Sequence, residues 1–592
     1  MFTTRPEIAG TFGVVATTHW IASSVGMAVL EKGGNAFDAA VATAFVLNVA
    51  EPHLNGPGGD VPIIIHDAKA GTQHVICGQG VAPDKATPEA FAAMGLDLVP
   101  GTGLLPAVVP GAFDAWALML RDYGTMELAD VMEYAIGYAR NGIHLMPRIP
   151  AAIEQMRPLF EQEWKTSAAV WLPGGNVPGV GKLFARPALA DFWERLIRES
   201  KGAKTREARI DAARNQFYRG FAAEAIGRFY ENEILDSSGS RHKGLLTADD
   251  MARWAATVED PLAMDYHNYT VLKVGGWSQG PAMLQTLALL EKTDIAAMDP
   301  NGAEFVHTVV EAIKLAFADR EGYYGDPDHV QVPLGQLLSA PYNEARRALI
   351  TAAASMELRP GTIPGFNGIV DHEANKRIEL LTRAPGIGEP TVARLGAIGG
   401  DTCHIDVIDK WGNMVSATPS GGWLQSSPVV PELGFPLSTR GQMFWTTPGH
   451  PNSIAPRKRP RTTLSPSMAL RDGKPWLSFG TPGGDQQDQW QVIMFLRMVH
   501  HGMGIQQAID APSFHTEHFP SSFWPRVARP GKVVIEGRFG EAVLEDLKSR
   551  GHLAEMGGDW TEGRLSGARI EDDGQMFAGA NPRGNQGYAV GR

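Results

Sequence analysis

Two strand-like runs stand close together in the last third of the chain and limit the folds available to it. They are CHIDVID at 403–409, which alternates between polar and apolar residues, and NMVSAT at 413–418. Only Lys410, Trp411 and Gly412 separate them, and Gly412 can supply the positive φ of a hairpin turn. Hairpins in this region, in place of a regular βαβ alternation, favour antiparallel sheets packed between helical layers.

The first half of the chain is predicted to be mostly helical. Residues 22–50 are rich in alanine, glycine and apolar side chains and predict a helical segment, which the run EPHLNGPGGD ends with prolines and glycines. Val61–Ile65 predicts a short apolar strand. Apolar residues three and four positions apart predict a helical layer over about 110–355.

After about residue 355 the helical periodicity weakens, and prolines and glycines become frequent. Residues 356–400 contain RPGTIPGF, RAPGIGEP and GAIGGD, which indicate a loop or linker. Lys474–Phe479 predicts another strand, and the pattern DQQDQWQVIMFLRMVHH after it predicts a helix with Asp485 as its N-cap.

Composition excludes several classes of protein. The formal net charge of −12 disfavours polyanionic partners, and the short basic run Arg457–Arg461 lacks the aromatic residues that stack on nucleic acid bases. We therefore expect that run to be structural or solvated. Cys77 and Cys403 are too few for a disulfide framework, no run of about 18 apolar residues suggests a membrane span, and no secretory signal is evident. The expectation is a cytoplasmic protein that binds neither nucleic acid nor membrane.

Thr402 follows the glycine-rich GAIGGD segment and begins the first strand-like run. A threonine in this place is usually only the first residue of a strand. The alternative is a cleavage site between Asp401 and Thr402, since cleavage would leave an α-amine beside the threonine hydroxyl. Such an amine has a pKa of about 7.7–8.0, which suits a base for the nucleophile of the same residue.

Two further segments carry polar groups suited to a site. Gly483-Gly484 lies between a predicted strand and a predicted helix, so its two N–H groups can hold an oxyanion or a phosphate, or simply form a turn. The chain has no G-x-x-x-x-G-K-[ST] match, which counts against a nucleotide. Thr462 and Thr463 are either part of a surface loop or two hydroxyl donors in a polar pocket.

The cluster His515-Thr516-Glu517-His518 suggests a metal, because histidines at i and i+3 can share a helical face. Pro512 and Pro520 bracket it, and no further ligand pattern is evident. We expect no metal and no other cofactor.

Several of these motifs, in this order, resemble the γ-glutamyltranspeptidase family of N-terminal nucleophile (Ntn) hydrolases. The resemblance rests on GGNAFDAAVATAF, NGPGGD, VVPGAFDAW, DTCHIDVIDKWGNMVSAT, RKRPRTTLSPSM, FGTPGGDQQ and GANPR, which together span nearly the whole chain. It implies an α+β fold, a four-layer αββα sandwich with two central antiparallel sheets.

The resemblance also implies self-cleavage of a precursor before Thr402. The products would be a large fragment, 1–401, with a linker at about 356–401, and a small fragment, 402–592, which remain associated. Ser420 falls where the family places a second hydroxyl beside the nucleophile. Gly483 and Gly484 match the family's oxyanion-hole glycines, and Thr462 and Thr463 match hydroxyl residues that contact the substrate carboxylate.

This chain departs from the family where the γ-glutamyl group is recognised. Gln79 stands in the place of an arginine, and Gln442-Met443 in the place of an acidic pair. Gly422 replaces a residue with an amide side chain, and Trp423 beside it is large enough to fill part of the acyl site. The loss of a charge-assisted contact weakens binding by about 1.5–3 kcal/mol per hydrogen bond, so a γ-glutamyl group should bind poorly.

We therefore expect an amidohydrolase that cleaves a small acyl amide, of the oxamate, glutaryl or cephalosporin type, through a threonyl ester. Three alternatives remain open: a true γ-glutamyltransferase, an uncut relative without enzymatic activity, and a metal-dependent hydrolase that uses the cluster 515–518. The sequence leaves the acyl group and a homo-oligomer undecided.

Overall fold

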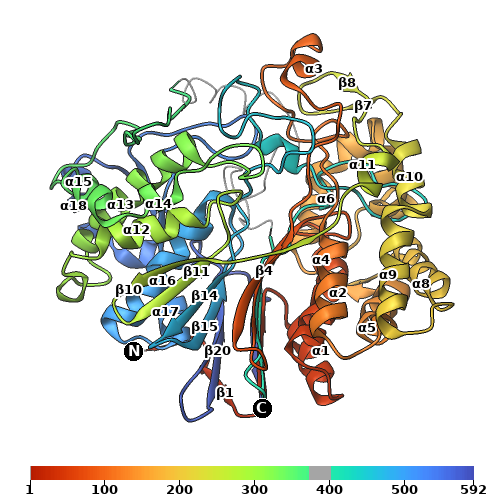
Figure 1. Cartoon of the computed structure of the whole chain (residues 1–592), viewed down its shortest axis with the longest axis horizontal. Coiled ribbons are helices and arrows are strands. Elements are labelled where there is room, and N and C mark those ends of the chain that lie inside the picture. Colours follow the sequence, from red (N-terminus) through yellow and green to blue (C-terminus); the bar gives the residue numbers. More distant parts are fainter. Residues whose placement is uncertain (1, 373–401) are drawn as a thin grey trace.

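The computed structural model describes residues 2–372 and 402–592 of the chain, and two seven-stranded sheets form its centre (Figure 1). Every pair of neighbouring strands within them is antiparallel. One sheet, named here the β15 sheet, has the order β1 (Ile8–Gly10), β20 (Met576–Ala580), β19 (Ser566–Ile570), β15 (Lys474–Gly480), β14 (Ser467–Arg471), β11 (Tyr269–Lys273), β10 (Leu262–Tyr266). The other, the β12 sheet, has the order β21 (Tyr588–Gly591), β2 (Gly13–Thr17), β12 (Ile405–Asp409), β13 (Met414–Ala417), β3 (Val61–Asp67), β4 (Thr72–Gly78), β9 (Thr257–Glu259).

The predicted hairpin is confirmed as β12 and β13. Their register pairs Ile405 with Ala417 and Val407 with Val415, and Gly412 between them has a φ of 88°. Both neighbours of this hairpin in the sheet, β2 and β3, come from the first 70 residues. Strands from either side of position 401 thus interleave in one sheet.

Successive residues of β12 face opposite sides, as in any strand. Ile405 and Val407 pack with the helices that cover the β12 sheet, whereas Ile408 packs between the two sheets. Side chains from both sheets meet in that central layer, among them Val14, Ile64, Met414, Leu272, Met468, Ala568 and Ala578. By this alternation, residues 402, 404 and 406 lie on the side of the chain that faces the β15 sheet.

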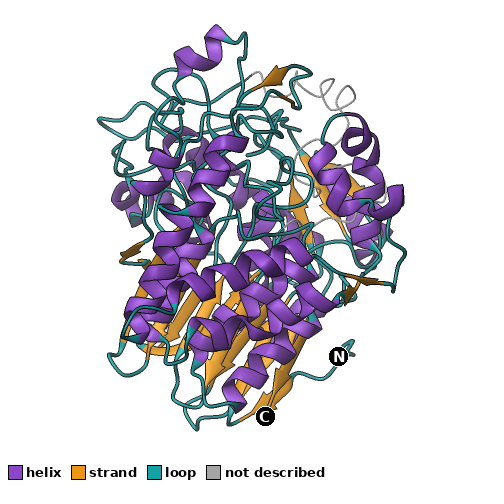
Figure 2. Ribbon diagram, turned by 90° about the vertical axis from the view of Figure 1, so that its right-hand side faces the viewer, coloured by secondary structure: helices purple, strands orange, loops and turns teal. Residues whose placement is uncertain are grey.

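Helices cover the outer side of the β12 sheet, and Figure 2 shows them lying across its strands. α2 (Ala36–Ala50) is buried along its whole length and contacts β12, and α1 (Trp20–Glu31) contacts β2. The other helices before residue 255 are α3 (Pro88–Ala93), α4 (Ala112–Tyr123), α5 (Leu128–Asn141), α6 (Arg148–Gln162), α7 (Lys165–Trp171), α8 (Pro187–Ser200), α9 (Arg206–Tyr218), α10 (Phe221–Phe229) and α11 (Ala248–Ala252).

A second set of helices packs on the β15 sheet. α16 (Gln487–His501) contacts β15, and α17 (Ile505–Asp510) contacts β20. The other helices of this side are α12 (Pro281–Leu290), α13 (Ala303–Tyr323), α14 (Leu334–Leu337), α15 (Ala340–Arg347) and α18 (Glu541–Ser549), and a small sheet of β16 (Phe514–Thr516), β17 (Lys532–Ile535) and β18 (Leu553–Met556) lies beside them. Among the described residues, no helix is both long enough and apolar enough to cross a bilayer.

Two predictions of secondary structure need correction. The single helical segment over 22–50 is two helices, because the turn after Glu31 contains Gly33 at a φ of 97° and Asn35 then caps α2 with its side chain. The helical layer over 110–355 also contains strands, of which β9, β10 and β11 belong to the two large sheets. The strands predicted at Val61–Ile65 and Lys474–Phe479 are confirmed as β3 and β15.

Candidate active site

Thr402 is buried and lies in a short ladder of three chain segments. It pairs antiparallel with Ser420, and Ser420 pairs antiparallel with Asp60 on its other side. The Thr402 hydroxyl donates a hydrogen bond to Ser420 Oγ at 3.2 Å. Directly opposite residues of antiparallel segments point to the same face, so the three side chains form a row. Asp401, the other residue of the predicted cleavage site, lies outside the described residues.

Glycines make this ladder possible. A Cβ on Gly59 would lie 2.2 Å from the carbonyl oxygen of Ser420, and one on Gly56 would lie 2.3 Å from that of Gly422. Gly422 itself has a φ of 62° and faces the backbone of Gly58 and Gly59. The run NGPGGD therefore packs backbone against backbone beside Ser420, which no residue with a side chain permits.

Gly483 and Gly484 form the turn that leads into α16. Their φ angles are 132° and 53°, both in the region that favours glycine. No described residue accepts a hydrogen bond from either N–H group. Two unpaired N–H groups at the start of a helix attract negative charge.

A buried network fixes this turn from behind. Gln279 donates from Nε2 to the carbonyl oxygen of Gly484 at 3.0 Å and accepts a hydrogen bond from Arg320 at 2.9 Å. Arg320 also pairs with Asp485 at 2.5 Å, and Asp485 accepts hydrogen bonds from Ser522 N and Oγ. The predicted N-cap role of Asp485 is wrong, because its carboxylate binds these partners and no side chain of a described residue caps α16.

The glycine turn and Thr402 lie at the same end of the two sheets. His404, two residues after Thr402, packs so closely on Gly480 at the end of β15 that a Cβ there would lie 2.2 Å from its ring. Its ring nitrogens contact Thr418 Oγ1 at 2.9 Å and Asp406 at 3.1 Å. Gly480 precedes Gly483 by three residues, so this contact brings the turn close to the nucleophile candidate.

Thr462 and Thr463 are buried, which excludes a surface loop. The backbone of Thr462 bonds to Trp277 and Gln279, and its hydroxyl accepts a hydrogen bond from Leu464 N. Thr463 Oγ1 has no hydrogen-bond partner among the described residues. Since buried hydroxyls are nearly always paired, Thr463 is the residue of this pair suited to a ligand.

The residues predicted to line the acyl site are all buried. Gln79 donates to the carbonyl oxygen of Gly80, and its Oε1 has no partner among the described residues. Gln442 donates to the carbonyl oxygen of Gly101, and Met443 contacts a guanidinium nitrogen of Arg440 at 4.0 Å.

The sequence did not indicate Asp60 and Arg440, which form a fully buried ion pair with Nε 2.6 Å from Oδ2. Ser438 Oγ donates to the other carboxylate oxygen, and the guanidinium lies 5.5 Å from the Trp423 ring. Burial raises the pKa of Asp60, and Arg440 counters that rise. An aspartate directly after a glycine-rich turn can be recognised in the sequence as a candidate site residue. The neighbouring residues, however, do not indicate that Arg440 is its partner.

Another buried acid lies behind the nucleophile candidate. Glu51 accepts hydrogen bonds from Cys403 Sγ at 3.1 Å and from Thr18 Oγ1 at 2.5 Å, and it also bonds to Gln586. Burial raises its pKa despite these donors. Cys403 points to the helix side, opposite to Thr402, so Glu51 supports the strand from the other face.

Two clusters singled out from the sequence have other roles. Residues 514–516 form β16, a strand and not a helix, and His515 pairs with Glu562 at 2.5 Å while His518 bonds to backbone atoms. In the basic run, Arg459 pairs with Asp326 and Arg461 with Glu321, all of them buried. These cations stabilise the interior, as the structural interpretation predicted.

One described group of side chains has metal-ligating composition, namely His307, Glu311 and His552. The histidines bond to each other at 2.8 Å, and Glu311 pairs with Lys314 at 2.5 Å. Because the Lys314 ammonium group already binds the Glu311 carboxylate, this cluster resembles a structural hydrogen-bond network more than a cation site.

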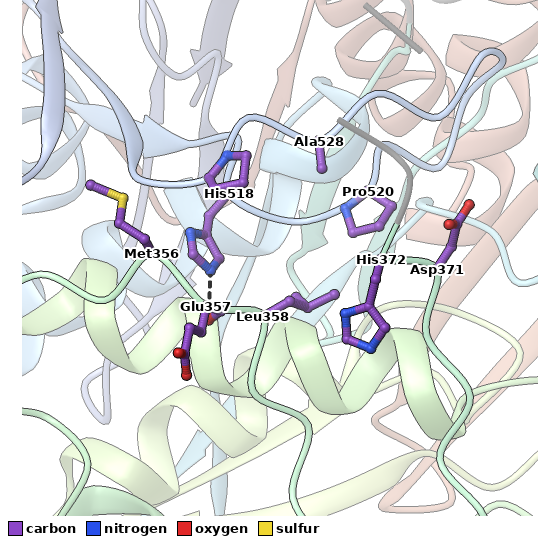
Figure 3. Close-up of a pocket in the computed structure, with 9 residues that line it drawn as sticks. Met356, Glu357, Leu358, Asp371, His372, His518, Pro520 and Ala528 are labelled. Carbon is purple, nitrogen blue, oxygen red and sulfur yellow. Dashed lines mark hydrogen bonds between the residues drawn. The ribbon is translucent and has the colours of Figure 1, made fainter. Parts of the chain in front are cut away.

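A cavity of about 430 Å³ lies between residues 356–358 and residues 518–530 (Figure 3). His518 reaches across it to the carbonyl oxygen of Glu357 at 3.0 Å. The segment that walls it also contacts the network behind the glycine turn, since Arg320 donates to the carbonyl oxygen of Pro520.

Comparison with known proteins finds matches that span nearly the whole chain. The family model described as gamma-glutamyltranspeptidase matches residues 22–591. The chain is 31% identical to the glutathione hydrolase-like YwrD proenzyme of Bacillus subtilis (strain 168), over 99% of both chains. Its structure resembles that of LmbA2991HD, at 53% identity with a TM-score of 0.94 over 100% of both chains. It also resembles cephalosporin acylase from Bacillus halodurans, at 27% identity with a TM-score of 0.83 over 100% of this chain and 98% of the other. This chain belongs to the gamma-glutamyltranspeptidase family.

Proposed function

We propose that the chain is a proenzyme that cuts itself before Thr402 and then hydrolyses a small acyl amide. The observation that carries this proposal is the position of Thr402. Its hydroxyl contacts Ser420 at 3.2 Å, at the end of the sheets where the N–H groups of Gly483 and Gly484 have no acceptor among the described residues. Relatives described as a glutathione hydrolase-like proenzyme and a cephalosporin acylase support the same class of reaction.

Cleavage turns the nucleophile into its own base. The α-amine of Thr402, once freed, has an ordinary pKa of about 7.7–8.0 and takes the proton from the hydroxyl of the same residue. The hydroxyl oxygen attacks the amide carbonyl, the amine leaves with a proton, and water then hydrolyses the threonyl ester. Ser420 orients the nucleophile through the hydrogen bond that it already accepts.

The glycine turn stabilises the intermediate. The N–H groups of Gly483 and Gly484 bind the oxyanion that forms when the carbonyl is attacked, and loss of one such donor typically lowers kcat by about 10²–10³-fold. Maturation uses the same groups: the Thr402 hydroxyl attacks the carbonyl of residue 401, and water opens the resulting ester.

The two fragments, 1–401 and 402–592, would remain one body after cleavage. Each large sheet contains strands from both fragments, so separation would expose unpaired strand edges. We assign the whole to the four-layer αββα architecture of Ntn hydrolases, because helices pack on the outer side of each sheet and apolar side chains fill the space between the sheets.

At Gln79 and Met443 the acyl site offers a γ-glutamyl group no charged contact. Gln79 offers no charge, and the unpaired atom of its side chain is an acceptor, which repels a carboxylate. Met443 offers no acid to an α-ammonium group.

A substrate panel tests this proposal. Purified, processed enzyme is assayed on primary amides, acyl anilides and γ-glutamyl anilide, with Thr402→Ala as the blank. We expect hydrolysis of an acyl amide and none by the blank. Activity that survives in Thr402→Ala would refute the nucleophile. Hydrolysis of γ-glutamyl anilide as fast as the best acyl amide would refute the specificity and favour a glutathione hydrolase.

A further inference from the structure

Arg440 has a donor that the fold does not use. Its guanidinium is buried and pairs with Asp60 through Nε, and within the described parts of the chain Nη1 reaches only the sulfur of Met443, at 4.0 Å. Nη2 is buried as well and has no partner among the described residues. Buried charged donors are almost always paired, so an unused guanidinium N–H group calls for a ligand as its explanation.

The ladder at the active site places this donor on the nucleophile's side. Thr402, Ser420 and Asp60 stand opposite one another in succession, and their side chains share one face. Each step of such a row spans about 5 Å between Cβ atoms, so the Cβ of Asp60 lies on the order of 10 Å from that of Thr402. The Arg440 guanidinium lies next to it, with Nε 2.6 Å from the Asp60 carboxylate.

The surroundings of Arg440 suit an extended aliphatic chain with an anionic end. Trp423 and Met443 contact the guanidinium, and both are buried. Gly422 carries no side chain, and the backbone of Gly58 and Gly59 packs directly against it beside Asp60.

A guanidinium that already binds one carboxylate can hold another. Arg459 in this chain pairs with Asp326, Glu259 and Asp328 together, and Arg320 pairs with both Glu321 and Asp485. The planar fork allows this because its five N–H groups point in different directions. Asp60 therefore does not prevent Nη2 from binding a substrate carboxylate.

We propose that Arg440 is the specificity residue of this enzyme and that it binds the distal carboxylate of an ω-carboxyacyl amide. This inference rests on the proposed function and names its substrate class. A five-carbon acyl chain extends about 5 Å at roughly 1.5 Å per bond along its zigzag. Contacts of about 3 Å at each end make a total on the order of 10 Å, which matches a glutaryl group and is too long for the two-carbon oxamate.

Three chromogenic anilides test the inference. N-glutaryl anilide has the distal carboxylate, N-pentanoyl anilide has the same length without it, and γ-glutamyl anilide adds an α-ammonium group. The measured quantity is the ratio of kcat/KM for the glutaryl to the pentanoyl substrate. We expect the native enzyme to favour the glutaryl substrate, and Arg440→Gln to lower the ratio by about 10- to 100-fold, mainly through KM.

Arg440→Gln leaves Asp60 without its cation and can impair folding. The double variant Asp60→Asn/Arg440→Gln removes both charges with little change of shape, so its ratio should fall like that of the single variant. Arg346→Gln is the matched control. It removes another buried ion pair, the one between Arg346 in α15 and Asp319 in α13, among the helices that pack on the β15 sheet. The control should keep the native ratio.

The outcomes separate this inference from the proposed function. If both substrates lose kcat/KM equally in the double variant, Arg440 only positions the ladder and the inference is wrong. If the native enzyme hydrolyses neither these anilides nor the primary amides of the substrate panel, the proposed function fails. Calorimetry with glutarate then tests the Arg440 site: binding to the native enzyme that the double variant lacks supports the inference, and no binding to the native enzyme overturns it. A native ratio near one also overturns it.

Discussion

Replacing Gly483 by alanine would test the glycine turn more sharply than any other single change. Its φ of 132° is one that L residues rarely adopt, and an added Cβ would lie 2.3 Å from Cζ3 of Trp490. That indole is buried at the start of α16, so it has little room to move. The turn itself must therefore shift, and with it the two unpaired N–H groups.

The size of the effect follows from two separate terms. A positive φ in a residue other than glycine costs about 1–2 kcal/mol, and overpacking in a filled core costs about 1–3 kcal/mol. These terms lower stability by a few kcal/mol. The displaced oxyanion donors should lower kcat by about 10²–10³-fold, and self-cleavage should slow in proportion, because it uses the same groups.

Gly502→Ala is the control, since it changes a glycine at the other end of the same helix. Gly502 has a φ of 63°, but nothing lies within 4 Å of the Cβ that would be added. It should lose stability through its φ alone and retain both kcat and the rate of self-cleavage. Initial rates on the best acyl amide and a time course on denaturing gels measure the two effects. The role of the turn would be refuted if Gly483→Ala matured and turned over within threefold of the native protein.

Two other predictions concern ionisation. Burial raises the pKa of Cys77 to about 12 and that of Cys403 above its usual value. Neither thiol should therefore react with Ellman's reagent at pH 8 until the protein is denatured. Prompt reaction of either thiol in the native protein would contradict this prediction. Although burial alone lowers the pKa of His515, the carboxylates of Glu562 and Glu517 raise it to about 10. The native state therefore binds a proton that the unfolded state releases above about pH 6.5, and stability should be full below that pH and fall by up to about 4 kcal/mol toward pH 10. Urea unfolding at pH 6 and pH 9.5 measures the fall, and an equal fall in His515→Gln would show that another group causes it.

Local patterns in the sequence predicted the parts of the fold that local patterns determine. The alternation of 403–409, the turn at Gly412 and the strand at Lys474–Phe479 depend on neighbouring residues alone, and the structure confirms them. The motif around Thr402 also contains Ser420, which follows only 18 residues later and accepts the hydrogen bond of the Thr402 hydroxyl.

The features that local patterns did not predict depend on contacts between distant parts of the chain. Asp60 and Arg440 are 380 residues apart, so no local pattern joins them. Asp485 looked like a helix cap because the sequence contains no sign that Arg320 and Ser522 would bind it. The spacing of His515 and His518 suits one face of a helix, but residues 514–516 pair with β17 and form a strand. In each case tertiary contacts decided what the local sequence left open.

The account depends on a free amino group at Thr402, and mass spectrometry of the active enzyme measures it directly. The intact protein, separated under denaturing conditions, should give fragments of about 43 and about 21 kDa, in proportion to their share of the 63.8 kDa chain, and the smaller should begin with unmodified Thr402. A fully active preparation in which the peptide bond between residues 401 and 402 is intact would contradict the account.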